Sequence, residues 1–413
     1  MLDWSEDSQP IIEAVRRFVD EEIRPKLDSI EHEGEPPYEI LRSFYKTFGI
    51  DQLEAESFDR AIERKERGEG PPTNSRRSLA SVEMGLIPTI ELSRVSPGIV
   101  TSLGVSTALA AGTIMKQGTL EQMHRWGKDL MTLDKIGAWA ITEPDSGSDA
   151  LGGMRTTAVR DGDEYVLNGQ KTWITNGPYA DTIVLYAKLD DGSGTELRDR
   201  PVVTFILDKG MEGLTQSASM RKMGQRSSPT GEVFLADVRC GVDRLLGGSE
   251  GRGAKGGSSE GRSSAKSNFT TERAGVAAMA LGIIEECLRV SIDYAKNRHL
   301  WGKPIADFQL IQLKLANMEV ARVNVRNLIF RHLETTAEGF PASLAEASAM
   351  KLYSAKAAVE VANEAIQLFG GNGYISEYRV EQLARDARVL QIYAGTDEMQ
   401  VVAIAKDLLR REN

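Results

Sequence analysis

The chain has 413 residues, of which 41% are hydrophobic and 27% charged, and its formal net charge is −10. This composition is ordinary for a globular protein of two or three domains, and the acidic balance argues against non-specific nucleic-acid binding. No apolar run approaches the ~20 residues of a membrane span. The first residues lack a signal-peptide pattern, and two cysteines and four histidines favour neither a disulfide framework nor a metal site. We therefore expect a cytoplasmic protein without an integral membrane segment.

The first 135 residues carry a helical pattern. Apolar side chains from Ile11 to Ile23 recur at intervals of three and four residues, which is typical of an amphipathic helix. The pattern continues to about Leu133 and is interrupted by a charged stretch at 54–77. We interpret that stretch as a solvated helix and loop insertion rather than a recognition surface. The sequence thus predicts an N-terminal α-helical domain over 1–135.

Residues 136–246 follow a different pattern, in which short β-branched and aromatic runs predict strands. The runs begin at Thr156, Glu164, Thr182, Val202 and Glu232. Turn sequences such as Asn168-Gly169 and Asp191-Gly192 separate them. The expected structure is an antiparallel β domain over 136–246.

A Gly- and Ser-rich segment follows the β region. Residues 247–266 contain no apolar side chain larger than Ala and include an imperfect repeat, 249–255 and 259–266. Such a segment buries too little surface to offset its ordering entropy, so we predict a flexible loop over 247–267. Its basic residues offer an alternative role near phosphate groups: Arg252, Lys255, Arg262 and Lys266. Long helical patterns return from 268 to 413, with stops near Gly339 and Gly370, and predict a C-terminal helical domain.

Two segments gather polar groups and flat rings at the ends of predicted strands. They are Ile141-Thr-Glu-Pro-Asp-Ser-Gly-Ser-Asp149, which follows Trp139, and Lys171-Thr-Trp-Ile-Thr-Asn-Gly177. Hydroxyls and backbone N–H groups of a Gly-containing turn, such as those of Thr142 and Ser148, can converge on anionic oxygen. Trp173 offers a face for stacking, and Thr175 lies two residues on, on the same side of a strand. Together the segments indicate a flavin site, although Trp173 alone would be interpreted as a core aromatic.

The α–β–α order, the 141–149 segment and Gly370-Gly-Asn-Gly-Tyr374 together resemble the acyl-CoA dehydrogenase family. The resemblance covers nearly the whole chain apart from the two insertions. It implies an α+β fold with an N-terminal helical domain, a middle antiparallel β-barrel or sandwich, and a C-terminal four-helix bundle. It also implies FAD as cofactor, an acyl-CoA substrate and an electron-transfer flavoprotein as partner.

The resemblance assigns the flavin contacts. The residue matching Trp173 covers the isoalloxazine ring in the family, and the one matching Thr175 bonds near its N5. The segment 296–303 with Gln309 resembles the part that reaches the pyrophosphate and adenine of a neighbouring subunit, and Gln367 matches the same shared site. Each flavin is therefore expected to be built from two chains of a homodimer or homotetramer. The expected FAD-binding residues are Trp139, Ile141, Thr142, Gly147, Ser148, Trp173, Ile174, Thr175, Arg298, Trp301, Gln309, Gln367, Gly370, Gly371, Thr396 and Glu398.

The catalytic base is expected at Glu272. Removing the α-proton of a thioester requires a carboxylate within ~3 Å and hydrogen bonds that polarise the carbonyl. Many family members carry this carboxylate in a Tyr-Glu-Gly-Thr motif, but here the motif is Tyr393-Ala-Gly-Thr396, and Ala394 cannot accept a proton. A subset places the base directly before an arginine after the β domain, and Glu272-Arg273 resembles that isovaleryl- and long-chain-type branch.

Two questions about Glu272 stay open at this point. A helix N-terminus and the adjacent Arg273 would both favour the charged carboxylate, whereas desolvation would oppose it, and the sequence does not decide the balance. A structural carboxylate in the first turn of a helix is the alternative interpretation.

Gly104 bears on the acyl group. It matches a position where a larger side chain closes the acyl pocket of medium-chain relatives, so it favours a long or bulky acyl group, with branched and steroid-derived thioesters also open. The expected substrate-binding residues are Ser148, Phe269, Thr270, Arg273, Ala394 (through its backbone N–H), Gly395 and Gly104.

The predicted reaction is the α,β-dehydrogenation of an acyl-CoA to the trans-2-enoyl-CoA, as in fatty acid β-oxidation, with Glu272 as base and flavin N5 as hydride acceptor. Two alternatives remain. One is an oxygen-using flavin oxidase or monooxygenase on the same fold, and the other is a non-catalytic partner subunit of a hetero-oligomeric dehydrogenase.

Overall fold

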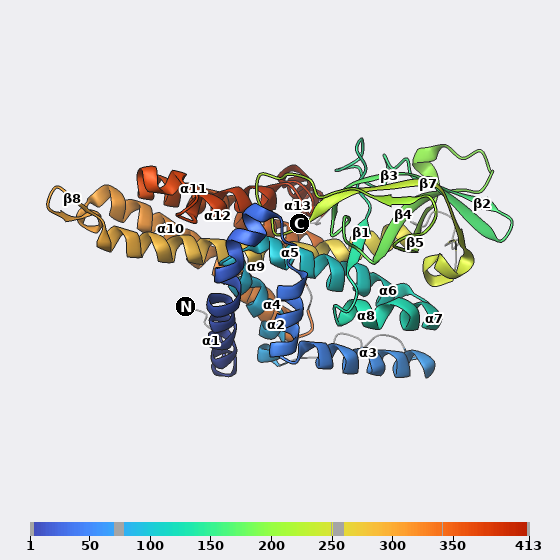
Figure 1. The fold of residues 1–413 in the computed structure, drawn as a ribbon, viewed down its shortest axis with the longest axis horizontal. Helices are drawn as coiled ribbons and strands as arrows, with labels where there is room; N and C mark the ends of the chain where they lie inside the picture. Colours follow the sequence, from blue (N-terminus) through green and yellow to red (C-terminus); the bar gives the residue numbers. More distant parts are fainter. Residues whose placement is uncertain (1–3, 70–77, 249, 251–259, 341, 411–413) are drawn as a thin grey trace.

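A computed structural model describes residues 4–69, 78–248, 250, 260–340 and 342–410. Figure 1 shows three regions: helices of the N-terminal part in blue and teal, a green β region at one end, and orange and red C-terminal helices reaching the other end. The long helix α9 (Glu260–Asn297) starts beneath the sheet and runs to the far end of the molecule. It thus connects the two ends of the fold.

The N-terminal region is helical, as its periodicity predicts. Its helices are α1 (Gln9–Phe18), α2 (Tyr38–Thr47), α3 (Ile50–Glu66), α4 (Leu79–Ser93), α5 (Pro97–Gly104), α6 (Gly112–Gln117), α7 (Leu120–Gln122) and α8 (Lys128–Met131). A π-helical segment, η5 (Val105–Ala111), joins α5 to α6. The charged stretch at 54–77 begins within α3, where Phe58 and Ile62 are buried against Met123, so this helix is anchored rather than wholly solvated. Residues 70–77 lie outside the described residues.

One stretch of the described residues, Pro97–Gln117, is long and apolar enough to cross a membrane by composition. It spans α5, η5 and α6, and 56% of its most apolar window is buried inside the protein. Burial of this kind is typical of a core helix.

The middle strands form a mixed sheet. They are β1 (Gly137–Ala140), β2 (Thr157–Asp161), β3 (Glu164–Thr175), β4 (Thr182–Asp190), β5 (Val202–Asp208), β6 (Leu214–Gln216) and β7 (Thr230–Gly241). The order is β1-β4-β2-β3-β7-β6, with β5 paired to β4. The prediction of a purely antiparallel domain is wrong in one respect, because β4 pairs in parallel with both β1 and β2. Side-chain periodicity reports which face of a strand is buried but not which direction its neighbour runs.

The C-terminal region contains, besides α9, α10 (Gln309–Ala337), α11 (Leu344–Phe369), α12 (Val380–Arg388) and α13 (Asp397–Leu408). A small hairpin, β8 (His299–Leu300) and β9 (Lys303–Pro304), joins α9 to α10. The predicted loop over 247–267 is wrong from residue 260 onward, because α9 already begins there. The segment 260–267 contains Glu, Arg, Ala and Lys, which are good helix formers, and polarity alone does not prevent a helix that is continuous with a buried one. Residues 249 and 251–259 lie outside the described residues.

Helices α9 and α11 run parallel in a constant register. Arg273 Nη1 donates to Ser348 Oγ at 2.8 Å, and the rings of Tyr294 and Phe369 stack with centroids 4.1 Å apart. Both pairs are 75 residues apart in sequence. Because a helix rises 1.5 Å per residue, the 21 residues between the two contacts separate them by about 30 Å.

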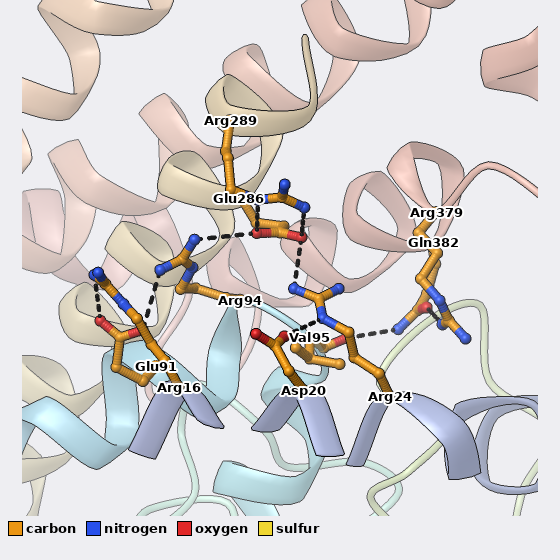
Figure 2. Close-up of polar contacts among 10 residues, drawn as sticks. All are labelled: Arg16, Asp20, Arg24, Glu91, Arg94, Val95, Glu286, Arg289, Arg379 and Gln382. Carbon is orange, nitrogen blue, oxygen red and sulfur yellow. Dashed lines mark hydrogen bonds and ion pairs between the residues drawn. The ribbon is translucent and has the colours of Figure 1, made fainter. Parts of the chain in front are cut away.

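Ion pairs join the N-terminal helices to α9 (Figure 2). Glu286 on α9 accepts hydrogen bonds from Arg24 at 2.9 Å and from Arg289 at 2.8 Å, and Arg94 at the end of α4 lies 3.3 Å away. Arg94 also bonds to Glu91 at 3.1 Å. The Glu286 side chain is only 4% exposed. This network therefore fixes the N-terminal helices against the bundle from within the interface.

Candidate active site

A buried ion pair joins the two cofactor motifs. Lys171 Nζ on β3 lies 2.8 Å from Glu143 Oε1 in the turn after β1, and it also donates to the Ile141 carbonyl at 3.1 Å. The Thr172 N–H donates to the Thr142 carbonyl at 2.9 Å. Burial lowers the pKa of Lys171 to about 8, with Glu143 acting in the opposite direction. Burial would raise the pKa of Glu143, but its attraction to Lys171 and its hydrogen bonds leave it below the usual value.

Trp173 is presented outward from a bulge in β3. The register against β7 shifts between Lys171 and Ile174, and Trp173 takes the left-handed value φ +59°. Its side chain is 63% exposed although its neighbour Ile174 is buried. A bulge of this kind re-aims a side chain, and here it directs a large aromatic ring away from the sheet. Thr175, two residues on, is half-buried.

Asn176 fixes the end of this segment. It is buried with φ +62°, and its Nδ2 donates to the Ser102 and Gly137 carbonyls at 2.9 Å each. Its Oδ1 accepts a hydrogen bond from the Tyr38 hydroxyl at 3.1 Å. These hydrogen bonds therefore fix the backbone directly after the strand segment that carries the exposed Trp173. Sequence reasoning missed Asn176, Lys171 and Glu143. The signal available for Lys171 and Glu143 was a charged residue inside each of the two motifs.

The surroundings of Trp173 fit a flavin. Trp139 on β1 is half-buried, and within the described residues its Nε1 has no hydrogen-bond partner although it is shielded from water. Gly147 and Ser148 in the first motif are exposed, so their polar groups are accessible, and Thr142 is half-buried. An exposed ring, an unpartnered indole N–H and an accessible Gly-Ser turn are the groups that a planar ring with a phosphate arm requires.

Glu272 lies well inside α9. The helix begins at Glu260, twelve residues earlier, so the objection that a helix N-terminus would hold Glu272 ionised does not apply. Burial raises the pKa of Glu272 to about 7, against the opposing charges of Arg273 and Lys351. Phe269, one turn earlier, lies 6.0 Å from the Arg273 guanidinium. Thr270 is half-buried beside it. Desolvation therefore outweighs the two positive charges in setting the pKa of Glu272, a result that the sequence alone does not decide.

The Tyr393–Thr396 loop lies beside this carboxylate. Ala394 and Gly395 both take positive φ angles, +53° and +84°. Lys351 Nζ donates to the Gly395 carbonyl at 2.9 Å, and Gln400 Nε2 donates to the Ala394 and Gly395 carbonyls at 3.1 and 2.7 Å. A methyl group built on Gly395 would lie 3.6 Å from the Arg273 guanidinium. The loop is therefore held between α9 and two buried side chains of α11 and α13.

The last expected members of this loop have separate roles. The Thr396 side chain caps α13 by accepting a hydrogen bond from the Met399 N–H at 3.4 Å, and Glu398 is exposed. Sequence reasoning missed Lys351 and Gln400, because neither lies in a recognisable motif.

Open space lies beside Gly104. A Cβ built there meets no atom within 4 Å, and the same is true of Gly275, one turn after Glu272. Thr101 Oγ1 lies 3.7 Å from Met279 Sδ, and the Tyr393 hydroxyl lies 3.6 Å from the same sulfur. These contacts place the face of α5 that carries Gly104 opposite the face of α9 that carries Glu272.

The direction of the two segments supports this placement. Thr101 contacts Met279, and Phe269 packs against the same cluster of buried residues as Ala110 and Ala111, which is consistent with positions that rise along α5–η5 as they fall along α9. Gly104 consequently faces the part of α9 between Phe269 and Met279. A π-helical segment such as η5 widens a helix locally and is frequent at functional sites.

The remaining expected FAD-binding residues lie at the opposite end of the bundle. Arg298 and Gln309 flank the β8–β9 hairpin, Trp301 at its tip is 87% exposed, and Gln367 precedes Gly370 at the end of α11. The Tyr294–Phe369 stack belongs to this end, about 30 Å along α9 from Arg273. Figure 1 shows β8 at the end of the molecule farthest from the sheet. The fold brings Arg298, Trp301, Gln309, Gln367, Gly370 and Gly371 toward one end, and it does not bring them to Trp173 within one chain.

Comparison with known proteins identifies the family of the chain. The model of the acyl-CoA dehydrogenase middle domain matches residues 138–238, and that of the C-terminal domain matches 259–409. The chain is 34% identical over 409 residues to 3-(aryl)acrylate reductase of Clostridium sporogenes, covering 98% of this chain and all of that one. It is 35% identical over 409 residues to subunit CarC of the caffeyl-CoA reductase–Etf complex of Acetobacterium woodii, covering 99% and 100%.

A solved structure of a glutaryl-CoA dehydrogenase from Mycobacterium smegmatis in complex with FADH2 superposes with a TM-score of 0.79 at 27% identity, covering 99% of this chain and 96% of that one. The predicted α+β fold and FAD as cofactor are thereby confirmed. The chain belongs to the acyl-CoA dehydrogenase family of FAD-dependent oxidoreductases.

Proposed function

We propose that the protein dehydrogenates an acyl-CoA thioester to the trans-2-enoyl-CoA with Glu272 as the base. The observation that carries this proposal is the position of Glu272, a carboxylate with its pKa raised to about 7 beside the Tyr393–Thr396 loop. A base with a pKa near the working pH is ionised often enough to act and still has a strong affinity for a proton. Glu272 thereby replaces the carboxylate that the loop lacks at Ala394.

The loop supplies the complementary group. Among the described residues, none accepts a hydrogen bond from the Ala394 N–H, so this donor is available to the thioester carbonyl. A hydrogen bond there stabilises the negative charge that develops on the carbonyl oxygen as Glu272 removes the α-proton. The β-hydrogen leaves with its electron pair as the carbon–carbon double bond forms. FAD, when bound, supplies the two-electron acceptor for that hydride.

The cofactor is proposed to contact residues from two regions. Trp139, Trp173 and Thr175 would hold the flavin end, and Arg298 and Gln309 of a second copy would hold the phosphate and adenine end. Arg298 suits a phosphate because its guanidinium offers planar paired donors. This division predicts a homodimer or homotetramer.

The acyl group is proposed to be bulky. Gly104 and Gly275 leave open space on facing sides of the region next to Glu272. Two relatives are named for substrates that carry an aromatic ring, 3-(aryl)acrylate and caffeyl-CoA. A branched, long or flat aryl chain would each use this space. We further propose a cytoplasmic enzyme that exchanges electrons with an electron-transfer flavoprotein, a partner named in the complex that contains the CarC relative.

The test is to purify the chain, record its visible spectrum and add saturated acyl-CoAs without oxygen. Bleaching of the yellow flavin by one class identifies the reaction and the substrate together. Glu272→Gln should retain the flavin and lose the bleaching, whereas near-normal bleaching in this variant contradicts the assignment. Gly104→Leu should reduce bleaching by bulky substrates at least about tenfold and spare butyryl-CoA, because each methylene excluded from a pocket costs about 1–3 kcal/mol and Leu excludes more than one.

Two other outcomes favour the alternatives. Rapid reoxidation of the reduced enzyme by air indicates an oxygen-using enzyme on this fold. A colourless or unresponsive protein indicates a non-catalytic subunit.

A further inference from the structure

We infer that Lys351 is a positioning residue for this reaction, which both holds the Tyr393–Thr396 loop in place and adjusts the charge balance at Glu272. The inference rests on the proposed function, because it assumes that Glu272 is the base and that the Ala394 N–H binds the carbonyl. Lys351 lies on α11, binds the loop through the Gly395 carbonyl, and belongs to no motif.

Lys351 is a fully buried cation with few partners. Its side chain is 0% exposed, and its Nζ donates to the Gly395 carbonyl at 2.9 Å and lies 3.6 Å from Asp397 Oδ1. Removing an ammonium group from water costs several kcal/mol unless nearby groups compensate, so a buried lysine is retained only where its charge or its bond has a use. Holding the loop does not by itself require a charge, because the neutral Gln400 amide already donates to the Gly395 carbonyl.

The loop needs support because its backbone is strained. A left-handed conformation costs a residue with a Cβ about 1–2 kcal/mol, and Ala394 adopts one at φ +53°. Such conformations persist where the surroundings over-determine them. Gln400 binds the Ala394 carbonyl, and Lys351 and Gln400 both bind the Gly395 carbonyl. These bonds fix the two peptide groups that follow the Ala394 N–H and so limit the backbone rotation at Ala394 that would turn this donor. Loss of either side chain should therefore leave the Ala394 N–H less well directed toward the thioester carbonyl.

The positive charge of Lys351 also opposes the effect of burial on Glu272. The charged and titratable groups that face this carboxylate are Arg273 on its own helix, Lys351 on α11 and the Tyr393 hydroxyl in the loop, and Asp397 of α13 faces Lys351. Burial raises the pKa of Glu272, and Arg273 and Lys351 each lower it. The Arg273 guanidinium is also bonded to Ser348. Without Lys351, burial would be opposed by Arg273 alone among these groups, and the pKa of Glu272 would rise further.

The two roles are separable by variants. Lys351→Met removes both the hydrogen bond and the charge, whereas Gln400→Leu loosens the same carbonyls and leaves the charge at Glu272 unchanged. The measurement is the rate of anaerobic flavin bleaching by a saturating acyl-CoA as a function of pH, on holoenzyme with its FAD content recorded.

Both variants should bleach at least about tenfold more slowly on the alkaline plateau, because a misplaced donor acts far less well on the reacting carbonyl. Lys351→Met alone should move the acidic limb of the pH–rate profile to higher pH by about half a unit or more, because a nearby cation no longer stabilises the ionised form of Glu272. Lys351→Arg, which keeps the charge, should return the limb toward that of the wild type.

An unchanged acidic limb in Lys351→Met overturns the inference, and so does a shift of the same size in Gln400→Leu. Should Lys351→Met purify without flavin, Lys351→Gln carries the same expected shift with a neutral polar side chain. The Glu272→Gln variant keeps the two proposals distinct. If it still bleaches, the proposed function fails, and if it does not while Lys351→Met has a normal limb, only the role of Lys351 fails.

Discussion

Lys171 on β3 and Glu143 after β1 form an ion pair of 2.8 Å between two buried side chains, 28 residues apart in the chain. Glu143 also accepts hydrogen bonds from the Arg155 and Thr156 N–H groups at 2.6 and 2.9 Å. The pair therefore holds three segments of the flavin region together. A carboxylate that receives this many donors depends on them to remain ionised in the interior.

Lys171→Met should destabilise the protein by about 3–5 kcal/mol, because it leaves the Glu143 carboxylate buried without its cation. Flavin retention should fall with it, since Trp173 is two residues away on the same bulge. Urea unfolding and the flavin-to-protein absorbance ratio measure both effects. The control is the double variant with Glu143→Gln, which removes both charges and should cost less than the single change. A single variant as stable as the wild type would show that the pair is dispensable.

The sequence predicts the flavin motifs, the helix–strand–helix order and the choice of Glu272, because each depends on residues close together in the chain. It does not predict the partners of those residues. Lys171 contacts Glu143, and Lys351 contacts Gly395, only in the folded chain, where strands and helices that are far apart in sequence lie together. The sequence does not predict the pKa of Glu272 for the same reason, because the start of α9 at Glu260 and the burial of the carboxylate are properties of the fold.

The raised pKa of Glu272 predicts a pH-dependent effect on stability. The folded value of about 7 lies above the ordinary 4.5, so the folded state binds an extra proton between these values. The stability contributed by this group is therefore fully present below pH 4.5 and is lost as the pH rises through 7. Glu272→Gln, which mimics the protonated form, should raise the melting temperature relative to the wild type more at pH 8 than at pH 5. An equal difference at both pH values would show that Glu272 titrates normally.

Glu286 predicts the opposite pH dependence. Burial would raise its pKa, but its hydrogen bonds to Arg289 and the charges of Arg24 and Arg94 lower it to about 2. A depressed folded pKa contributes stability above the unfolded value of 4.5 that is lost as the pH falls through 2. Glu286→Gln should therefore cost about 3 kcal/mol at pH 7, because it removes the buried negative charge that Arg24, Arg94 and Arg289 stabilise.

The stability difference between Glu286→Gln and the wild type should narrow when urea unfolding is repeated at pH 3. Glu164→Gln is a matched control, because Glu164 pairs with Arg239 at an exposed site and such pairs contribute about 1 kcal/mol or less. If Glu286→Gln costs no more than this control, the N-terminal helices are held to the bundle by apolar packing alone.

The separation of the two groups of expected FAD-binding residues predicts complementation between subunits. Trp173 lies at the β region and Arg298 at the far end of α9, at opposite ends of the molecule in Figure 1. If one chain supplies the flavin contacts and its partner the phosphate contacts, Trp173→Ala and Arg298→Ala should each weaken FAD binding at every site of a homo-oligomer. Co-expression of the two variants should restore about a quarter of the wild-type flavin content by random pairing, and about half in the purified mixed pair, because a mixed pair has one site with both changes and one with neither. Recovery no greater than the mean of the two single variants would place each flavin within one chain, and the approximately 30 Å along α9 would then have to be bridged by a rearrangement of the fold.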